Sequence, residues 1–311
     1  MNLIMIDLEK YTQEYWGLMR QHAYRLTGSI LDADDIVQDT MLRAIEMGPT
    51  LENIEDHSEW LYTACTEAAL SRLREKKPLE VNEFDLPDLI QTRDSSTNGE
   101  TKSIEADAVW PSVALEFLFP LQYMTPEQRA VVVLRDGVED GDRIAASVMG
   151  ITIQEVFKIA DNADKKRAQI HKHWEKNLFS KSTDEQEKAA RVFERFVEAL
   201  GFRDKVLLQG LMSPGVEFIV RDERRTGDDF VAVACTELLG QMGEKLTFSP
   251  VWFNGYRGVL IWTWRTRRNE WLRCGAIMVL NGDLNVKAMK WYLDGHLLRV
   301  IQAEVPQTSS N

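Results

Sequence analysis

Residues Asp32 to Arg43 read DADDIVQDTMLR, and this stretch decides the fold of the N-terminal part of the chain. Asp32 is a candidate helix N-cap, because its carboxylate can accept hydrogen bonds from the first free backbone amides. Apolar residues then recur at helical spacing and predict a core face, made of Val37, Met41, Ala44 and Ile45. The same spacing gives a second, mostly polar face, made of Asp35, Gln38, Asp39 and Leu42. Periodicity alone favours a capped surface helix with one solvated side.

The whole chain has 311 residues, 44% of them hydrophobic, which is enough for two or three modest domains. Its net charge of −12 argues for a protein partner first, because proteins that bind DNA alone usually present a basic surface. No phosphate loop, nucleotide fingerprint or metal-ligand spacing occurs, so no cofactor and no metal are expected.

Compartment signals in the sequence favour the cytoplasm. The N-terminus, MNLIMIDLEK, has no signal-peptide pattern, and no run of eighteen apolar residues predicts a membrane span. The three cysteines are widely spaced and odd in number, which is typical of reduced thiols; they are Cys65, Cys235 and Cys274.

The segment AYRLTGSILDADDIVQDTMLRA, residues 23–44, resembles conserved region 2 of the extracytoplasmic-function (ECF) sigma factors. The resemblance implies a helical domain over residues 1–77 that binds core RNA polymerase. In that family an acid–x–x–Gln–acid face grips a coiled coil of the largest polymerase subunit. The residues at the matching positions here are Asp35, Gln38 and Asp39, with Leu42 beside them.

A third helix, expected from His57 or Ser58, resembles the part of region 2 that reads the promoter minus-ten element. Trp60, Arg72 and Arg74 would contact DNA there. Two departures weaken this expectation. Glu67 and Ser71 stand where the family usually has Asn and Asp, and the 46–59 loop, which cradles an extruded base in the family, is acidic.

Residues 78–108 are polar and acidic and predict a flexible linker. A short apolar motif, Asp85-Leu86-Pro87-Asp88-Leu89, lies where sigma factors with a long C-terminal extension carry a Trp–Leu–Pro–Glu–Pro motif. We interpret it as a docking clip, in which Leu86 and Pro87 meet aromatic residues of the C-terminal domain: Trp252, Phe253 and Tyr256.

Residues 109–178 resemble sigma region 4, a helix-turn-helix domain. Thr125-Pro126-Glu127-Gln128-Arg129 matches the start of its first long helix, and Gly150 falls at the turn. The resemblance implies contacts with the minus-thirty-five element from Thr152, Gln154, Lys158, Lys165 and Lys166. However, residues 155–164 carry three acids and one lysine, which is unusual for a helix that enters the major groove.

Residues 183–306 combine helices with four later strand-like runs and predict an α+β domain, followed by a tail at 307–311. The order of elements and Phe253-Asn254-Gly255 resemble the SnoaL-like branch of the NTF2-like cone fold. Some of its relatives are enzymes, but the polar candidates here form no catalytic pattern, so no enzyme is expected; they are Asp222, Asp228, Asp229, Tyr256 and His296.

The sequence therefore predicts a multidomain chain: two all-α sigma domains followed by an α+β NTF2-like domain that regulates them. Its function would be promoter-specific transcription initiation with core RNA polymerase, with promoter DNA bound inside the holoenzyme and no membrane partner. An anti-sigma factor and a small-molecule ligand of the cone are further partners that the resemblance allows. Two alternatives stay open: a sigma-like regulator that has lost promoter reading, and an NTF2-like ligand sensor or enzyme with vestigial sigma domains.

Overall fold

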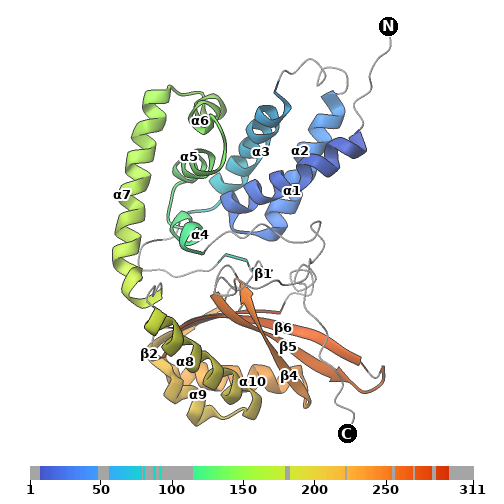
Figure 1. Cartoon of the computed structure of the whole chain (residues 1–311), viewed down its shortest axis with the longest axis vertical. Coiled ribbons are helices and arrows are strands. Elements are labelled where there is room, and N and C mark those ends of the chain that lie inside the picture. Colours follow the sequence, from blue (N-terminus) through green and yellow to red (C-terminus); the bar gives the residue numbers. More distant parts are fainter. Residues whose placement is uncertain are drawn as a thin grey trace. The chain divides into compact units, whose positions relative to one another are not determined.

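A computed structural model describes residues 8–47, 56–78, 80, 87–88, 91–92, 115–178, 183–220, 223–253, 256–268, 270–281 and 285–293. The contacts divide the chain into two units. The first unit contains residues 1–83 and 116–171 and is helical, whereas the second contains residues 84–115 and 172–311 and is built around a sheet (Figure 1). The polar segment between the two predicted sigma regions thus groups largely with the C-terminal unit.

The first unit begins with three helices packed on one another: α1 (Leu8–Thr27), α2 (Ile30–Met47) and α3 (His57–Arg74). Their shared core is apolar, and its most deeply buried large side chains are Met19, Tyr24, Leu26, Ile30, Ile36 and Leu61. Val37, Met41 and Ala44 are buried as predicted, but the fourth predicted core residue is not. Ile45 is 47% exposed, because the buried stripe of α2 continues through Ile36 and Thr40 instead.

The junction between α1 and α2 corrects the predicted N-cap. Gly28 adopts a positive φ of 68° and its amide bonds to the carbonyl of Tyr24, which ends α1. The Ser29 hydroxyl then accepts from the Asp32 amide at 3.3 Å, and the Ser29 carbonyl accepts from the Ala33 amide. Ser29 is therefore the cap, so α2 begins three residues earlier than predicted and Asp32 lies inside its first turn.

The rest of the first unit is a helix-turn-helix with a preceding short helix: α4 (Leu115–Leu121), α5 (Pro126–Gly137), α6 (Gly141–Met149) and α7 (Ile153–Leu178). Thr125 and Gln128 form the reciprocal capping box that starts α5, with Pro126 at the first helical position. Gly150 makes the turn after α6, as predicted. Its φ of +64° lies in the left-handed region, which strains residues that carry a Cβ and therefore favours glycine. The boundary between the two units falls within α7.

The two helical regions pack against each other within the first unit. The contacts run from α1 to α5 and from α3 to both α5 and α6. Tyr62 of α3 packs on the small core of the helix-turn-helix, which contains Val131, Leu134, Ile144, Ala145, Val156 and Ala160. The sequence treats these regions as two domains joined by a linker, whereas the structure places their helices in one body.

The second unit contains a seven-stranded sheet in the order β1-β4-β5-β6-β7-β2-β3. The strands are β1 (Gln91–Thr92), β2 (Met212–Val220), β3 (Glu223–Thr226), β4 (Leu246–Phe253), β5 (Tyr256–Arg265), β6 (Glu270–Asn281) and β7 (Val286–Tyr292). All neighbours are antiparallel except β2 and β7. The four predicted C-terminal runs are confirmed as β4 to β7, while β3, an exposed hairpin partner of β2, was not predicted.

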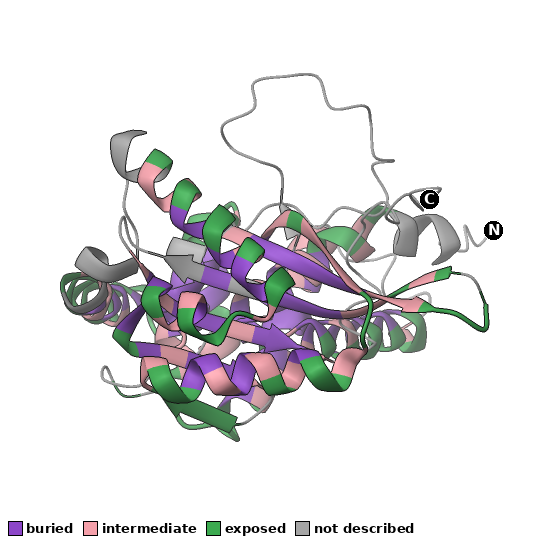
Figure 2. Ribbon diagram, turned by 90° about the horizontal axis from the view of Figure 1, so that it is seen from below, coloured by how far each residue is buried: buried purple, intermediate pink, exposed green. Residues whose placement is uncertain are grey.

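Three helices cover one face of this sheet: α8 (Thr183–Phe202), α9 (Lys205–Leu211) and α10 (Asp228–Met242). Figure 2 shows the buried positions along the strands and on the helix faces that meet them, with exposed positions on the outer helix faces. The core between the layers includes Phe193, Phe196, Leu239, Ile261, Met289 and Trp291. Gly258 is required where β5 leaves its hairpin, because a Cβ there would lie 2.3 Å from the Phe253 ring.

The three cysteines do not form disulfides with one another. Cys65 and Cys235 are buried and Cys274 is partly buried, and all three are free thiols. Burial raises the pKa of the Cys65 thiol to about 12 and that of Cys274 to about 11, so both stay protonated and unreactive at neutral pH.

Candidate functional site

The predicted polymerase-binding face lies on the exposed side of α2. Asp35, Gln38 and Asp39 are exposed, and Leu42 keeps 56% of its surface accessible. Two further apolar side chains continue the same side of the helix: Leu31 is 41% exposed and Ile45 is 47% exposed. The face is therefore a polar centre with apolar residues at both ends, an arrangement that suits a protein partner better than bulk water.

Cations at the end of α3 contact the start of α2. The two terminal nitrogens of Arg72 lie 3.3 Å from carboxylate oxygens of Asp32 and Asp35, and Lys76 Nζ lies 2.8 Å from Asp32. Arg72, predicted to contact promoter DNA, is thus paired with Asp35, predicted to contact polymerase. Both groups are partly exposed, so each pair contributes little stability and can be exchanged for other partners.

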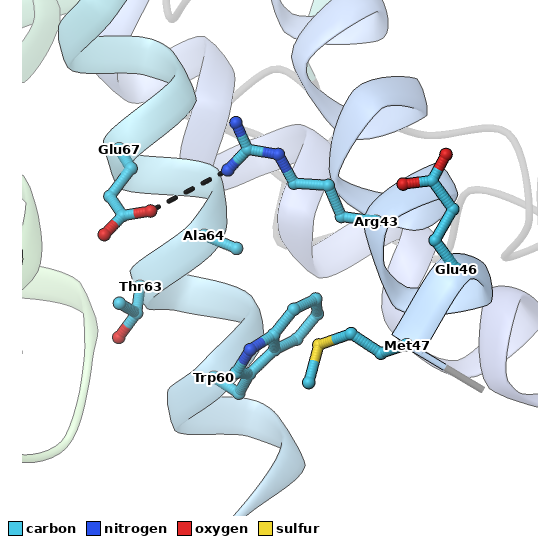
Figure 3. A pocket seen from close by; sticks show the side chains of 7 residues that line it. All are labelled: Arg43, Glu46, Met47, Trp60, Thr63, Ala64 and Glu67. Atoms are coloured by element: carbon cyan, nitrogen blue, oxygen red, sulfur yellow. Dashed lines mark ion pairs between the residues drawn. The ribbon is translucent and has the colours of Figure 1, made fainter. Parts of the chain in front are cut away.

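Trp60, the second predicted minus-ten residue, lines a pocket of about 450 Å³ between the end of α2 and the start of α3. Its other lining residues are Arg43, Glu46, Met47, Thr63, Ala64 and Glu67. Figure 3 shows the Trp60 ring beside the Met47 thioether, and the Arg43 side chain reaching across toward Glu67. Arg43 Nη1 and Glu67 Oε2 are 3.7 Å apart. Trp60 was the one member of this group predicted to contact DNA, because a pocket between helices has no linear signature in the sequence.

Polar contacts join the two helical regions. Arg74, the third predicted minus-ten residue, places its Nε 3.1 Å from Glu127 of α5. Arg143 of α6 lies 2.6 Å from Glu59 of α3. In this body, Arg74 is paired across the interface with the helix-turn-helix.

Arg129 forms the most deeply buried of these contacts. It is 6% exposed, and its Nη1 donates to the backbone carbonyl of Leu26 at 2.9 Å. That carbonyl lies in the last turn of α1, where the helix dipole favours a cation. Burial lowers the pKa of Arg129 to about 10, so it remains charged at neutral pH. The sequence placed Arg129 in the helix-start motif of region 4 and gave no signal that it reaches region 2.

The helix α7 carries the predicted minus-thirty-five residues. Thr152 caps it, because its hydroxyl accepts from the Glu155 amide and the Glu155 carboxylate accepts from both the amide and the hydroxyl of Thr152. These bonds hold the pKa of Glu155 below its usual value. Lys165 lies 2.5 Å from Asp161 one turn earlier, so one predicted DNA-binding cation has an acidic neighbour on its own helix. Gln154 and Lys158 are exposed and Lys166 is partly exposed.

Ile153 and Phe157 add an apolar element to the outer face of α7, at 42% and 49% exposure. The Phe157 ring lies under the guanidinium of Arg135, 5.8 Å from its centroid. The exposed side of this helix is therefore apolar and acidic as well as basic, unlike a surface built mainly for phosphate.

The docking clip meets the sheet of the second unit at its edge. Gln91 and Thr92 form β1 and pair with Phe253 and Trp252 of β4. The Tyr292 hydroxyl donates to the carbonyl of Pro87 at 2.6 Å, and Pro87 is buried. Sequence reasoning missed Tyr292. Leu86 lies outside the described residues, as do the side-chain surroundings of Tyr256.

Of the five polar candidates in the C-terminal domain, Asp228 and Asp229 have side chains that the structure describes. Asp228 accepts from Gln209 Nε2 at 3.2 Å, and Asp229 is exposed at the start of α10. Asp222 and His296 lie outside the described residues. Phe253 and Trp262 are buried, and across the described parts of the chain no cluster of three or more His, Cys, Asp or Glu side chains could hold a metal ion. Among the described helices, none combines the length and apolarity that crossing a membrane requires.

The N-terminal half of the chain is similar to known proteins. Residues 12–78 match sigma-70 region 2. The ECF RNA polymerase sigma factor SigG of Mycobacterium tuberculosis is 30% identical over 166 residues, which cover 47% of this chain and 45% of SigG. The ECF sigma factor SigJ of the same organism is 30% identical over 155 residues, 47% of each chain. The chain thus spans about half the length of the curated relatives it matches.

The fold is similar over a longer stretch. The crystal structure of M. tuberculosis SigJ aligns with 94% of this chain and 98% of its own, with a TM-score of 0.58 and 20% identity. The two proteins therefore share a fold. Over about half its length the chain is therefore similar to the ECF RNA polymerase sigma factors, with a sigma-70 region 2 domain at residues 12–78, and its fold, including the C-terminal α+β domain, resembles that of SigJ.

Proposed function

We propose that this protein is an ECF-type sigma factor that binds core RNA polymerase and directs it to promoters. The observation that carries the proposal is the exposed face of α2, within the segment that matches sigma-70 region 2. Asp35, Gln38 and Asp39 offer carboxylate and amide groups to a partner, and Leu42 supplies an apolar anchor beside them. Anchors of this kind, set among polar groups, commonly dominate protein interfaces.

Replacing Asp35, Gln38 and Asp39 together with Ala tests the polymerase face. We expect co-purification with core polymerase to be lost while the helical fold remains, because these side chains are exposed and such changes usually alter stability by less than about 0.5 kcal/mol each. Circular dichroism checks the fold, and pull-down on immobilised core polymerase measures binding.

A matched control is available on α7, where Asp161, Asn162 and Asp164 also combine two carboxylates with one amide on an exposed surface. Their triple replacement with Ala should leave polymerase binding unchanged. If the α2 variant binds core polymerase as well as the unaltered chain does, the polymerase face lies elsewhere and the proposal fails.

Promoter contact is assigned to region 2 and the helix-turn-helix. The Trp60 pocket would hold a base extruded from the minus-ten element, with Arg72 and Arg74 on neighbouring phosphates. Thr152, Gln154, Lys158, Lys165 and Lys166 would meet the minus-thirty-five element. Because the chain has a net charge of −12, these contacts would form inside the holoenzyme, where polymerase supplies most of the cationic surface.

A second candidate function is a sigma-like regulator that binds polymerase or an anti-sigma factor without reading promoters. It is favoured by the pairing of predicted DNA-binding cations with carboxylates: Arg72 with Asp32 and Asp35, Arg74 with Glu127, and Lys165 with Asp161. Run-off transcription with core polymerase on a library of random promoters separates the two. Transcripts that depend on this chain support the sigma factor; polymerase binding without transcripts supports the regulator.

The C-terminal cone is proposed as a regulator and not as an enzyme. Two contacts support this proposal. Strand β1, which lies between the two sigma regions in the sequence, pairs with β4 of the C-terminal sheet. The Tyr292 hydroxyl also donates a hydrogen bond to the Pro87 carbonyl. A ligand in the cone would regulate transcription only if it bound one state of this docking better than the other. No reaction is assigned to the cone.

Tyr292→Phe tests whether the segment around Pro87 docks on the C-terminal sheet, because it removes only the hydroxyl oxygen that bonds to Pro87. The buried Pro87 carbonyl would lose this donor, which costs about 1–3 kcal/mol and should raise the rate of proteolysis in the 79–115 segment about fivefold or more. Transcription in the run-off assay should change several-fold, in either direction. Tyr15→Phe removes the same atom from a partly buried tyrosine of α1, in the helical unit, and should alter neither readout. Identical proteolysis and transcription in Tyr292→Phe and the parent chain would contradict a regulatory docking.

A further inference from the structure

The turn that joins β5 to β6 gathers positive charge in an otherwise acidic chain (Figure 1). Residues 262–273 read WTWRTRRNEWLR and contain four arginines and one glutamate, so their net charge is +3, whereas that of the whole chain is −12. Three tryptophans are interleaved with these arginines. A local charge opposite in sign to that of the chain favours an anionic partner at this place.

A row of one lysine and two tryptophans crosses the ends of three strands. Trp264 lies opposite Trp271 in the β5–β6 pair, and its amide donates to the carbonyl of Lys245, just before β4. The two indole rings meet edge to face with their centroids 5.1 Å apart, and Lys245 Nζ lies 5.2 Å and 5.7 Å from them. Leu246 packs on the core beneath the helices, so Lys245 and this row lie on the opposite face of the sheet.

The arginines beside this row are exposed and only loosely paired. Arg265, Arg267 and Arg268 are all exposed. Glu270 Oε1 lies 4.0 Å from Arg265 Nη1 and 3.8 Å from Arg268 Nη1, so one carboxylate is shared between two guanidinium groups. Ion pairs this long and this exposed contribute little stability, and their guanidinium groups can turn toward phosphates instead.

Single-stranded nucleic acid has the chemistry that both parts of this surface require. Its phosphates are anions that guanidinium groups bind bidentately. Its unpaired bases offer flat faces that stack on indole rings, whereas the bases of a duplex are stacked on one another. Trp264 and Trp271 are partly exposed, so a base can reach them. An acidic protein segment would satisfy the arginines but would give the tryptophans no flat partner.

We propose that this end of the sheet binds a single strand of nucleic acid. The hairpin surface comprises Lys245, Trp264, Arg265, Arg267, Arg268 and Trp271. Its cations contact the phosphates, and its tryptophans stack on the bases. This inference gives the C-terminal domain a binding activity beyond its proposed regulatory role, and that activity does not require core polymerase.

Fluorescence anisotropy of the full-length protein with a labelled oligothymidylate tests the inference. In Arg267→Ala with Arg268→Ala, binding should weaken several-fold at low salt. The slope of log affinity against log salt should also fall by about 1.4, because each phosphate contact to a single strand contributes about 0.7. Trp271→Ala should weaken binding about fivefold or more, the effect of removing one base–aromatic stack, and Trp271→Phe should restore most of the loss because it keeps a ring. Thermal unfolding checks that each variant is folded.

Arg191→Ala with Arg195→Ala is the matched control, because it removes the same charge from exposed positions of α8 in the same domain. It should leave the affinity and the salt slope unchanged. An equal loss in this control, parent affinity in the Arg267 and Arg268 variant, or no measurable binding by the parent chain at low salt overturns the inference.

Three unlabelled competitors identify the ligand: a strand of abasic sites, a duplex and polyglutamate. Each should compete at least about fivefold less well than oligothymidylate, because each lacks an accessible base face. An abasic strand or a duplex that competes equally would show phosphate contact without stacking. Polyglutamate that competes equally would indicate an acidic protein as the partner. Either result overturns the assignment to single-stranded nucleic acid.

Discussion

Buried polar residues in the helical unit show how much a single side chain depends on its neighbours. His22 is 4% exposed, and its Nε2 lies 2.8 Å from the Thr66 hydroxyl, which joins α1 to α3. Burial, with a smaller effect from nearby Arg25, lowers the pKa of His22 from 6.5 to about 3. The imidazole is therefore neutral in the folded protein at every pH at which the protein is expected to work.

This burial makes the helical unit sensitive to acid. Between about pH 6.5 and 3, the unfolded chain binds a proton at His22 that the folded chain does not, so the free energy of unfolding falls as the pH falls. The slope from this group approaches about 1.4 kcal/mol per pH unit in the middle of that range. Urea unfolding at pH 7 and pH 5, compared between the parent chain and His22→Gln, should show a smaller acid loss in the variant by about 1–2 kcal/mol. An equal loss in both would mean that His22 is not the buried group responsible.

Among the elements, α7 has the structure of a DNA-recognition helix but not the basic surface expected of one. It has the cap, turn and position of a recognition helix, yet its exposed surface includes Asp161, Asp164 and Phe157. Acidic groups facing phosphate replace attraction with repulsion, and few counterions are released on binding. We therefore expect the free protein to bind duplex DNA more weakly than the roughly 10⁻⁸ M typical of dedicated DNA-binding proteins.

Asp161→Lys with Asp164→Lys should tighten duplex binding about tenfold at low salt and steepen its salt dependence, because two new cations can contact phosphates. Fluorescence polarisation with a random duplex measures both effects. Glu194→Lys with Glu198→Lys makes the same charge change on exposed positions of α8 and should have a smaller effect. If the two variants bind DNA equally, net charge and not the α7 surface controls the affinity.

The helical unit as a whole is too compact to reach two promoter elements at once. A compact body of about 140 residues has a radius of gyration of about 15 Å. The minus-ten and minus-thirty-five elements are separated by about 25 base pairs, or roughly 85 Å at about 3.4 Å per pair. Simultaneous contact therefore requires the α1–α5, α3–α5 and α3–α6 packing to separate.

Charge reversal at this interface should favour the separated state. Glu59→Arg with Glu127→Arg places like charges opposite Arg143 and Arg74, so we expect a larger radius of gyration in X-ray scattering and several-fold tighter core-polymerase binding. Adding Arg74→Glu and Arg143→Glu restores both pairs and should restore the compact form.

Glu75→Arg with Glu139→Arg changes the net charge equally at exposed positions and serves as the control. An unchanged radius in the interface variant would show that the two pairs do not hold the unit closed.

Most of the long helices and strands could be predicted from the sequence, whereas the short strands β1 and β3 could not. The stripes of α2, the Thr125 capping box and the turn at Gly150 depend on residues within a few positions of one another, so local patterns suffice to predict them. The four long strands of the cone followed for the same reason. Ser29 was missed as the cap of α2 because an acidic residue three positions later gives an equally good local signal.

The contacts between these elements could be found only in the tertiary structure. Arg129 reaching Leu26, Arg74 paired with Glu127, and Tyr292 bonded to Pro87 join residues 103, 53 and 205 positions apart. The Arg43–Glu67 pocket likewise needs two helices to be brought together. Such contacts depend on packing in three dimensions, and a single sequence carries no periodic or spacing signal for them.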